Sequence, residues 1–466
     1  MRAPSLLLSV LCLVAACAPS GGAGDGEVAA DAPSDVAADA SPVPVEITDF
    51  VITAHPGNPL AAYVEWQTAA AASTAVEVDC GPEHQALIDG PGLRTEHRVF
   101  VMGLLPGVSC LLRGRSEGPD GSSDDAEGSF TAGTVPDDLP APELAFAALD
   151  RVQPGWTLVN LTNTFDNVPL HVALLDGKGR YRWILRRSGP HTGLDTDVRL
   201  TPLGISIGGV THQDTPSIVD WEGRVVWEGD FFNHHEFRPV PGDADRFFAF
   251  TGEKDACGWG FNSQVVVIHD LWRHEHVWEW RLCENWTPPA IVEDWSHLNT
   301  IEPFPGEGAI LLSSREQNTL FKVSWPAGEL LWGLGEQGDF TFTDGTAFYH
   351  QHAPELTPEG TILLFDNGLH DQREWSRALE IGFDEESRTA HTVWEFRPDP
   401  DIYAPVWGDA DRLPNGNTLV VFGLWDPTRP THLIEVGPDA EEVWHLVLPP
   451  RWGVYRGERI PDPPAG

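Results

Sequence analysis

Lysine and arginine are scarce in this chain of 466 residues. Only 29 of them stand against 70 aspartates and glutamates, so the formal net charge is −41. This deficit argues against nucleic acid and against an anionic membrane surface as partners. No CxxC pair, HExxH motif or EF-hand loop is present, so the sequence predicts no cofactor and none of the common metal sites.

Long apolar segments are also missing. The apolar run that follows Arg2 is too short to cross a bilayer, and it ends in the tetrapeptide VAAC at Cys17. This pattern is typical of a bacterial lipoprotein signal, so we expect residues 1–16 to be removed and Cys17 to carry a lipid. The alternative is an ordinary signal peptide in which the cysteine has no role. Residues 17–45 contain no aromatic side chain, which predicts a disordered tether.

The predicted export of the protein determines whether its few cysteines are expected to form disulfides. The signal predicts a lipoprotein on the periplasmic face of an outer membrane or at the cell surface, attached to the membrane through its lipid alone. Four cysteines remain in the folded part, and each pair lies within one predicted domain. In an oxidising compartment they predict two disulfides, Cys80–Cys110 and Cys257–Cys283.

A tryptophan recurs at the end of strand-like segments along most of the chain. The six returns are spaced by roughly 40 to 60 residues and are Trp183, Trp227, Trp278, Trp332, Trp394 and Trp444. An array of small sheets at this spacing predicts an all-β protein with a six-bladed β-propeller over residues 145–466. Residues 156–183 have no inner strand before them, and WGVYRGERI near the C-terminus has no outer strands after it. Joining these two ends would complete one blade and close the ring.

Proline-containing turns repeat with the same period. Six residues before each turn proline, and before Pro461 in the tail, stand Thr196, His235, His297, His352, Gly408 and Tyr455. In a propeller the strand that enters each blade lines the central channel, so equivalent positions should meet there. The register therefore predicts that His235, His297 and His352 form a cluster on the axis. The alternative is three unrelated histidines with local hydrogen bonds, and composition also leaves a three-histidine metal site open.

Before the propeller, residues 46–135 are predicted to form a small β-sandwich. Short apolar strands alternate with turn residues throughout this segment. Trp66 in the strand YVEW and the LLPG turn before Cys110 resemble the fibronectin type III pattern, with Cys110 in place of the usual aromatic residue. Residues 136–144 are rich in proline and are predicted to be a linker.

Five segments of the propeller carry a more specific pattern. They are DWSHLNTI, LLSSR, QHAPEL, LLFDNG and GDADRLPNGNTL, and they follow one another in this order. Over residues 180–425 at least, the chain resembles the bacterial arylsulfate sulfotransferases. The resemblance implies a six-bladed propeller behind a β-sandwich. It also implies transfer of a sulfuryl group from a phenolic sulfate ester to a phenol, through a sulfated histidine and without a nucleotide donor.

Carried over by motif, the resemblance implies a role for five residues. His352 in QHAPEL would be the nucleophile, and the sulfuryl oxygens would be surrounded by His235, His297, Asn299 and Arg315. A neutral imidazole is a good nucleophile, and neighbouring cations would keep it neutral. The guanidinium of Arg315 offers a planar fork of donors to the sulfuryl oxygens. A protonated histidine could give its proton to the departing phenolate.

Several residues near these motifs are assigned no such role. His234 and His350 fall outside the register that faces the axis, so both are predicted to be bystanders. Ala353 stands where the family usually has an acidic residue. Asp366 and Asn367 in FDNG are interpreted as turn residues behind the channel.

Three other functions remain open at this stage. The first is a non-catalytic surface propeller lipoprotein that binds an anionic ligand. The second is a quinone-dependent dehydrogenase, which six tryptophan returns and a histidine-rich axis disfavour, since that class has eight blades and needs calcium. The third is a hydrolase that uses water as the acceptor. The sequence leaves the oligomeric state undecided, with a homodimer as one option.

Overall fold

The computed structural model describes residues 44–461, apart from positions 167, 188–196, 209–214, 255–256, 260–261, 305 and 425. In this part of the chain the secondary structure consists of 33 strands and one short 3-10 helix, η1 (Leu282–Glu284). The all-β prediction is therefore confirmed. Helices of the length and apolar character needed to cross a membrane are absent from the same residues. The predicted signal peptide, Cys17, nearly all of the tether and Thr196 lie outside the described residues.

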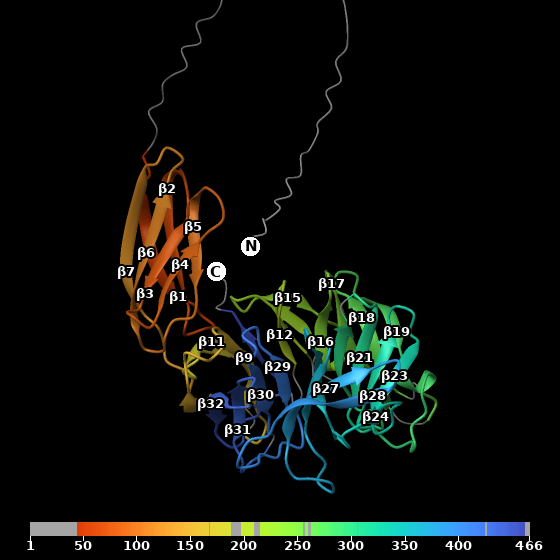
Figure 1. Ribbon diagram of the computed structural model, residues 1–466. Helices are drawn as coiled ribbons and strands as arrows, with labels where there is room; N and C mark the ends of the chain where they lie inside the picture. The colour runs from red at the N-terminus through yellow and green to blue at the C-terminus, as the bar shows by residue number, and fades with distance from the viewer. Residues whose placement is uncertain are drawn as a thin grey trace, which may run out of the picture. The chain divides into compact units, whose positions relative to one another are not determined.

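Seven strands near the N-terminus form two antiparallel sheets (Figure 1). One sheet contains β1 (Ile47–Ala54), β2 (Ala62–Ala72) and β5 (Arg94–Val101). The other contains β4 (Gln85–Asp89), β3 (Ala75–Asp79), β6 (Ser109–Glu117) and β7 (Ser123–Thr131). Every second side chain of β2 is buried up to Thr68, as one face packed on a core requires. The buried indole of Trp66 donates its N–H to the hydroxyl of Ser116 over 2.9 Å.

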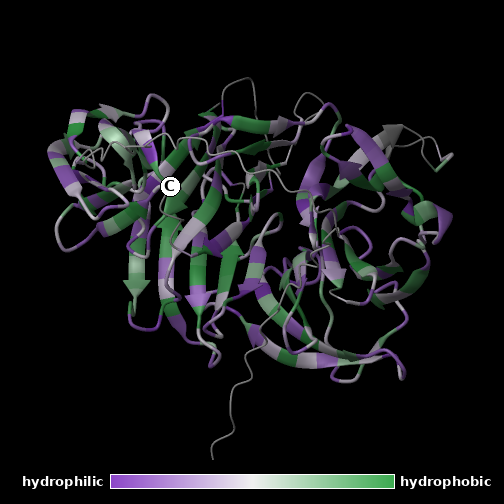
Figure 2. Ribbon diagram, turned by 90° about the horizontal axis from the view of Figure 1, so that it is seen from above, coloured by the Kyte–Doolittle hydropathy of each residue, from purple (hydrophilic) through white to green (hydrophobic). Residues whose placement is uncertain are grey.

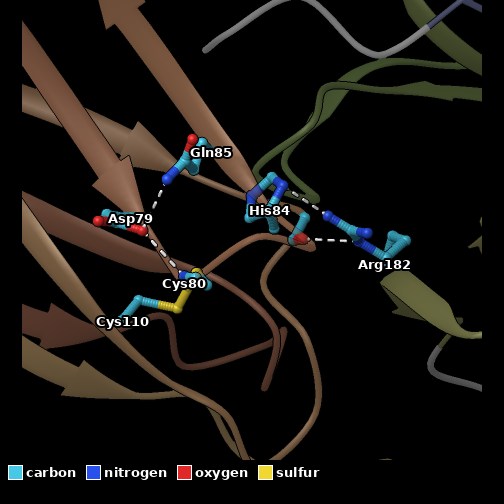
Figure 3. The surroundings of a disulfide bond; sticks show 8 residues. Asp79, Cys80, His84, Gln85, Cys110 and Arg182 are labelled. Carbon is cyan, nitrogen blue, oxygen red and sulfur yellow. Dashed lines mark hydrogen bonds between the residues drawn. A yellow bond between two sulfur atoms is a disulfide. The ribbon is translucent and has the colours of Figure 1, made fainter.

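Both predicted disulfides are present. The bond between Cys80 and Cys110 links the end of β3 to β6, and Figure 3 shows it beside Asp79, which accepts a hydrogen bond from Gln85 over 3.2 Å. In the same loop the His84 ring lies 2.8 Å from the guanidinium of Arg182. The second bond joins Cys257 to Cys283.

Six more sheets follow along the chain, and we name each one a blade, after its innermost strand. The first three are the β33 blade, with β9 (Trp156–Asn163), β10 (Val168–Leu175), β11 (Tyr181–Arg186) and β33 (Gly457–Ile460); the β12 blade, with β12 (Val198–Thr201), β13 (Gly204–Ile207), β14 (Ser217–Val219) and β15 (Val225–Glu228); and the β16 blade, with β16 (His234–Val240), β17 (Asp243–Lys254), β18 (Asn262–Asp270) and β19 (Glu275–Trp280). The others are the β20 blade, with β20 (Leu298–Phe304), β21 (Ala309–Ser314), β22 (Thr319–Ser324) and β23 (Leu330–Gly335); the β25 blade, with β25 (His352–Leu356), β26 (Ile362–Asp366), β27 (Arg377–Asp384), β28 (Thr389–Phe396) and β24 (Thr341–Phe342); and the β29 blade, with β29 (Asp409–Arg412), β30 (Thr418–Phe422), β31 (Thr431–Val436), β32 (Glu442–Leu448) and β8 (Glu143–Ala147).

The innermost strands contact one another in order. Strand β12 contacts β16, β16 contacts β20, β20 contacts β25, and β25 contacts β29. The last strand, β33, contacts both β12 and β30, so the ring of blades closes as in a β-propeller. Strand β33 also pairs with β9, with Gly457 opposite Val159 and Ile460 opposite Trp156. The predicted pairing of the two ends is therefore confirmed.

The recurring tryptophans connect neighbouring blades. Figure 2 shows hydrophobic residues along the strands, and several outer strands carry a buried tryptophan. Among the described residues, five indole N–H groups donate to a backbone carbonyl of the next blade over 2.7–3.0 Å, in the pairs Trp183–Trp221, Trp227–Leu271, Trp278–Pro326, Trp280–Gly328 and Trp444–Gly177. In the β16 blade the buried indole is that of Trp280, whereas Trp278, which the sequence pattern selected, is only partly buried.

The start of the propeller also differs from the expectation. Strand β8 begins at Glu143, inside the segment 136–144 that the sequence predicts to be a linker. It pairs with β32, with Ala147 opposite Trp444, and so adds a strand to the outer edge of the β29 blade. The alternation of apolar residues in β8 is short, and the prolines before it favoured the interpretation of this segment as a linker.

Candidate active site

Three predicted histidines lie at the starts of successive inner strands, and the structure brings them together. The Nε2 atoms of His235 and His297 are 3.2 Å apart. The Tyr455 ring stacks on His235, with 5.8 Å between centroids, and meets His352 edge to face at 6.3 Å. His235, His352 and Tyr455 are buried, while His297 is partly exposed. We call His235, His297, His352 and Tyr455 the axial cluster.

An unusual backbone conformation accompanies these positions. His235 and His297 have φ angles of 59° and 39°, in the left-handed region that most residues avoid. In the β25 blade the equivalent turn lies one residue later, at Ala353, with φ 47°. The fifth position of the register is Gly408, where φ is 119° and an added Cβ would come within 2.3 Å of the Phe365 ring. Strained backbone at non-glycine residues of one register is typical of functional sites.

The His352 ring is held on one edge. Its Nδ1 atom lies 2.7 Å from the side-chain oxygen of Asn367 and 3.1 Å from the carbonyl oxygen of His350. Asn367 therefore contacts the axial cluster directly. It lies in the turn after β26, but the interpretation that placed this residue behind the channel was wrong. Asp366 is fully buried and pairs with Arg373 and Arg377. The sequence could not indicate which way the Asn367 amide would face.

Burial and nearby cations both keep the central histidines neutral. Burial lowers the pKa of His352 well below its ordinary value, and the charge of Arg315 lowers it further. Burial, followed by the neighbouring histidines and Arg456, does the same to the pKa of His235. His352 is therefore an unprotonated, buried imidazole at neutral pH, which is the form able to act as a nucleophile.

Arg315 lies directly after β21, on the same side of the ring as the histidines. Its guanidinium donates to the carbonyl of Pro405 over 3.2 Å and contacts the carboxylate of Glu316. The side chain is only 14 % exposed. Its charge depresses the pKa of both His352 and His350, which places a fixed cation beside the cluster.

Asn299, by contrast, is built into the wall. The side-chain amide of Asn299 donates to the backbone carbonyl of Gln351 over 2.8 Å. The backbone carbonyl of Asn299 accepts a hydrogen bond from the guanidinium of Arg456 over 2.9 Å. The residue is fully buried. These bonds tie the β20 strand to the approach to β25, so they position the segments that carry His297 and His352.

Two neighbouring histidines lie closer to the cluster than the sequence indicated. The His234 ring packs edge to face on His235, with 4.8 Å between centroids. His350 has Nε2 4.0 Å from Glu316, and its pKa is lowered to about 4 by burial and by the charges of Arg315 and His297. His350 also contributes its carbonyl to His352, so it is not a distant bystander.

Sequence reasoning missed two further charged residues. Asp294 contacts Nδ1 of His297, so a chain of groups runs from Asp294 through His297 to His235. Its position three residues before His297 was the available signal. Arg456 follows Tyr455 in the tail and is buried, with Nη1 3.2 Å from Asp197 and 3.0 Å from Glu236.

Arg456 belongs to a buried layer of charges on the inner strands. Arg199 lies 3.0 Å from both Asp197 and Glu236. Burial opposes ionisation of Glu236, but Arg199 and Arg456 still hold its pKa at about 2. In the same layer burial raises the pKa of Asp409 to about 6. The carboxylates partly offset the positive charge of Arg456, which still lowers the pKa of His352, though less than burial and Arg315 do.

A cavity of about 570 Å³ opens on the same face of the ring. It is lined by the loops that follow β26, β28 and β30, including Tyr403 and Arg429, and by His432 on β31. Strand β26 runs antiparallel to β25, with Phe365 opposite His352, so the loop after β26 begins beside the cluster. Pro405, which accepts the hydrogen bond from Arg315, lies two residues from Tyr403. The loop after β28 therefore both lines the cavity and contacts Arg315, whereas the residues of the axial cluster are not among those that line the cavity.

No group of three or more histidine, cysteine, aspartate or glutamate residues is arranged to hold a metal ion among the residues that the structure describes.

Comparisons with known proteins concern the same part of the chain. Residues 149–447 match the family model described as Arylsulfotransferase (ASST). Two curated relatives are both described as arylsulfate sulfotransferase AssT. The protein from Escherichia coli O6:H1 is 29% identical over 182 residues, and that from Lelliottia amnigena is 28% identical over 177 residues. Each match covers 30% of this chain and 30% of the relative, so less than a third of their length is compared.

Solved structures with a similar course of the chain are more remote. The β-propeller domain of Myceliophteria thermophila Cps50 (Swd1) has a TM-score of 0.39 at 11% identity, and the match covers 67% of this chain and 89% of that one. Streptogramin B lyase has a TM-score of 0.37 at 9% identity, with 69% and 98% covered. Neither likeness is close enough to compare individual residues of the site.

Proposed function

Because the chain belongs to the arylsulfotransferase family, we propose that it transfers a sulfuryl group from a phenolic sulfate ester to a phenol, with His352 as the covalent carrier. No nucleotide donor takes part. The observation that carries this proposal is the neutral, buried ring of His352, held by Asn367 and facing the charge of Arg315. All three residues lie within the segment that matches the family.

In the first half-reaction the lone pair of His352 attacks sulfur, and the bond from sulfur to the aryl oxygen breaks. Sulfuryl transfer has a loose transition state like phosphoryl transfer, so catalysis depends on alignment and on stabilising the charge on the oxygens. Arg315 supplies that stabilisation, because its guanidinium is always charged and its donors form a planar fork. The buried setting strengthens each of these interactions.

The departing phenolate needs a proton, and the acceptor phenol must lose one. His297 can serve both steps: in its imidazolium form it gives a proton to the phenolate, and in its neutral form it accepts one from the phenol. Its Nδ1 atom contacts Asp294, and its Nε2 atom lies 3.2 Å from Nε2 of His235. In the second half-reaction the acceptor oxygen attacks sulfur and releases His352. Donor and acceptor therefore react in turn at one site, which predicts ping-pong kinetics.

We assign the aromatic ring of the substrate to the cavity of about 570 Å³, because the loop after β28 that lines it also contacts Arg315. Its size lies in the range of small-molecule sites, and it combines apolar side chains such as Leu424 with the phenolic ring of Tyr403. Water in place of the phenol would make the protein a hydrolase, and the same intermediate would serve both reactions.

We further propose that the protein is exported and held at a membrane by a lipid on Cys17. The two disulfides support an oxidising compartment. Cys17→Ser should release a soluble protein that retains its transfer activity. Recovery of the wild-type protein as a soluble, unlipidated species would contradict the anchor.

The function is tested with 4-nitrophenyl sulfate as donor and phenol as acceptor, without added metal or nucleotide and with a chelator present. We expect release of nitrophenol, formation of phenyl sulfate and parallel lines in double-reciprocal plots. His352→Ala should abolish both half-reactions. His391→Ala is the matched control, because His391 is an exposed histidine on β28 of the same blade. Equal turnover by His352→Ala and the wild type would refute the proposal.

A further inference from the structure

The side-chain amide of Asn367 is fixed in one orientation. Its nitrogen donates to the carbonyl of Ala404 over 2.7 Å and to the carbonyl of Trp407 over 2.6 Å. Both partners are pure acceptors, so they select the NH₂ end of the amide and leave its oxygen facing His352. Asn367 and Ala404 are fully buried, and Trp407 is nearly so.

This orientation has a consequence for the His352 ring. Its Nδ1 atom faces two oxygens, from the side chain of Asn367 at 2.7 Å and from the carbonyl of His350 at 3.1 Å. Neither oxygen can donate a hydrogen bond, so the proton of the interaction must lie on Nδ1. A neutral imidazole carries only one proton, so its lone pair lies on Nε2.

We infer that Asn367 is a positioning residue that holds His352 in the tautomer protonated on Nδ1, so that Nε2 is the atom that bonds to sulfur. The inference rests on the proposed sulfuryl transfer for the reaction, while the tautomer itself is a property of the resting protein. It adds a residue from the turn after β26 to the machinery of the site. Partners that fix the tautomer of a functional histidine commonly set its reactivity.

The chemistry balances with this assignment. The Nε2–sulfur bond forms as the bond from sulfur to the aryl oxygen breaks, and the electron pair leaves with the phenolate. The ring becomes a sulfated imidazolium that still carries its Nδ1 proton, and the oxygens of Asn367 and His350 stabilise its positive charge. The phenolate takes a proton from His297 in its imidazolium form, which leaves His297 neutral. When the acceptor oxygen attacks, the N–S electron pair returns to Nε2, and the proton of the acceptor passes to the neutral His297, which restores the imidazolium form.

The surrounding wall keeps Asn367 in place. The hydroxyl of Ser376 donates to the backbone carbonyl of Asn367 over 2.6 Å and accepts from the N–H of Ala404 over 2.9 Å. Ser376 therefore supports the same turn without contributing a hydrogen bond to the His352 ring. Ser376→Ala is for this reason a matched control for loosening of the wall.

The tautomer is read from two-dimensional nitrogen–proton spectra of the full chain with ¹⁵N-labelled histidine. The His352 signals are assigned as those missing from His352→Gln. We expect a protonated Nδ1 and a bare Nε2 in the wild type at neutral pH, and loss of the bare-nitrogen signal from Nε2 when the protein is sulfated. A proton on Nε2 in the resting protein would overturn the inference.

Two variants test the role of the side chain. Asn367→Ala should slow the first half-reaction about 10- to 100-fold, because only the His350 carbonyl would then accept the hydrogen bond from Nδ1. The donor KM should change little, because Asn367 contacts His352 and not the donor. Asn367→Asp keeps an oxygen acceptor but places a negative charge beside the ring, so the pKa of His352 rises and the acid limb of the pH–rate profile moves to higher pH. Ser376→Ala should lower stability and leave both the pH profile and the tautomer unchanged.

The two claims can fail separately. If the wild type releases no phenol from any aryl sulfate, the proposed function is wrong, and the spectra still decide the tautomer. If transfer is normal but Asn367→Ala keeps the wild-type rate, or Asn367→Asp leaves the acid limb in place, the positioning role is wrong. Should Asn367→Ala fail to fold, the wild-type spectrum and Asn367→Asp decide the matter.

Discussion

Replacing Arg315 separates the two contributions that its guanidinium makes. Arg315→Lys keeps a positive charge near His352 but replaces the planar fork of donors with a compact ammonium group, which cannot donate to two oxygens in the same geometry. Arg315→Gln removes the charge as well. In the structure Arg315 is the largest cause of the low pKa of His352 after burial, so the two variants should behave differently with pH.

The magnitude follows from the role of the fork. Loss of one preorganised donor to a developing anion commonly costs about 10²- to 10³-fold in rate, or about 2.7–4 kcal/mol. We expect Arg315→Lys to lose this much in the first half-reaction at every pH between 5 and 8, because the charge still keeps His352 neutral. Arg315→Gln should lose at least as much at pH 8 and progressively more toward pH 5. Without the neighbouring cation the pKa of His352 rises, and the neutral form becomes scarcer as pH falls.

The assay is stopped-flow release of 4-nitrophenol with no acceptor present, which reports the first half-reaction alone. Arg273→Lys is the matched control, because its side chain is 66% exposed on the β16 blade. Donor affinity is read from the concentration dependence of the burst. The reasoning fails if Arg315→Lys reacts within about twofold of the wild type, or if its whole loss lies in donor affinity, since the fork acts on the transition state.

Three further expectations concern the surroundings of the site and the two disulfide-bonded domains. His350→Ala should keep most of its steady-state rate, because only the backbone carbonyl of His350 contacts His352; complete loss of turnover would give the His350 ring a catalytic role. Removing the bond between Cys257 and Cys283 by a double serine substitution should lower the free energy of unfolding by about 3.5 kcal/mol in urea, as loop-closure entropy predicts for a separation of 26 residues; a change below about 1 kcal/mol would contradict that account. His97 lies between the hydroxyls of Thr68 and Thr74, and burial lowers its pKa to about 4. The unfolded state therefore binds the proton first, so the free energy of unfolding of the sandwich should fall by up to about 3 kcal/mol as pH drops from 6.5 toward 4; His97→Gln should remove this slope in denaturant titrations, and an unchanged slope would exclude His97 as its source.

Repeated local sequence patterns predicted much of the fold. The tryptophans and turn prolines recur with each blade, so counting from the prolines found the inner-strand positions of His235, His297 and His352. The same logic paired the C-terminal strand β33 with β9, since both ends were incomplete blades. Periodic signals of this kind depend only on residues that are close in sequence, so they can be recognised before the structure is known.

Features that depend on distant partners could not be found this way. Asn367 faces His352 only because its amide is captured by Ala404 and Trp407, about forty positions later in the chain. Arg456 stands 259 positions from its partner Asp197, and no local motif connects them. Strand β8 forms by pairing with β32 at the outer edge of the β29 blade. The composition of residues 143–147 does not indicate that this edge is available for pairing.

The central claim is that His352 becomes covalently sulfated. The most direct measurement is the intact mass of the protein after mixing with an excess of phenyl sulfate and no acceptor, followed by peptide mapping. We predict an increase by the mass of one SO₃ group, located on His352, absent from His352→Ala and reversed on addition of phenol. An unmodified mass while phenol is released, or a sulfuryl group on any other residue, would contradict the account, and an unmodified mass with bound donor and no release would favour an anion-binding propeller.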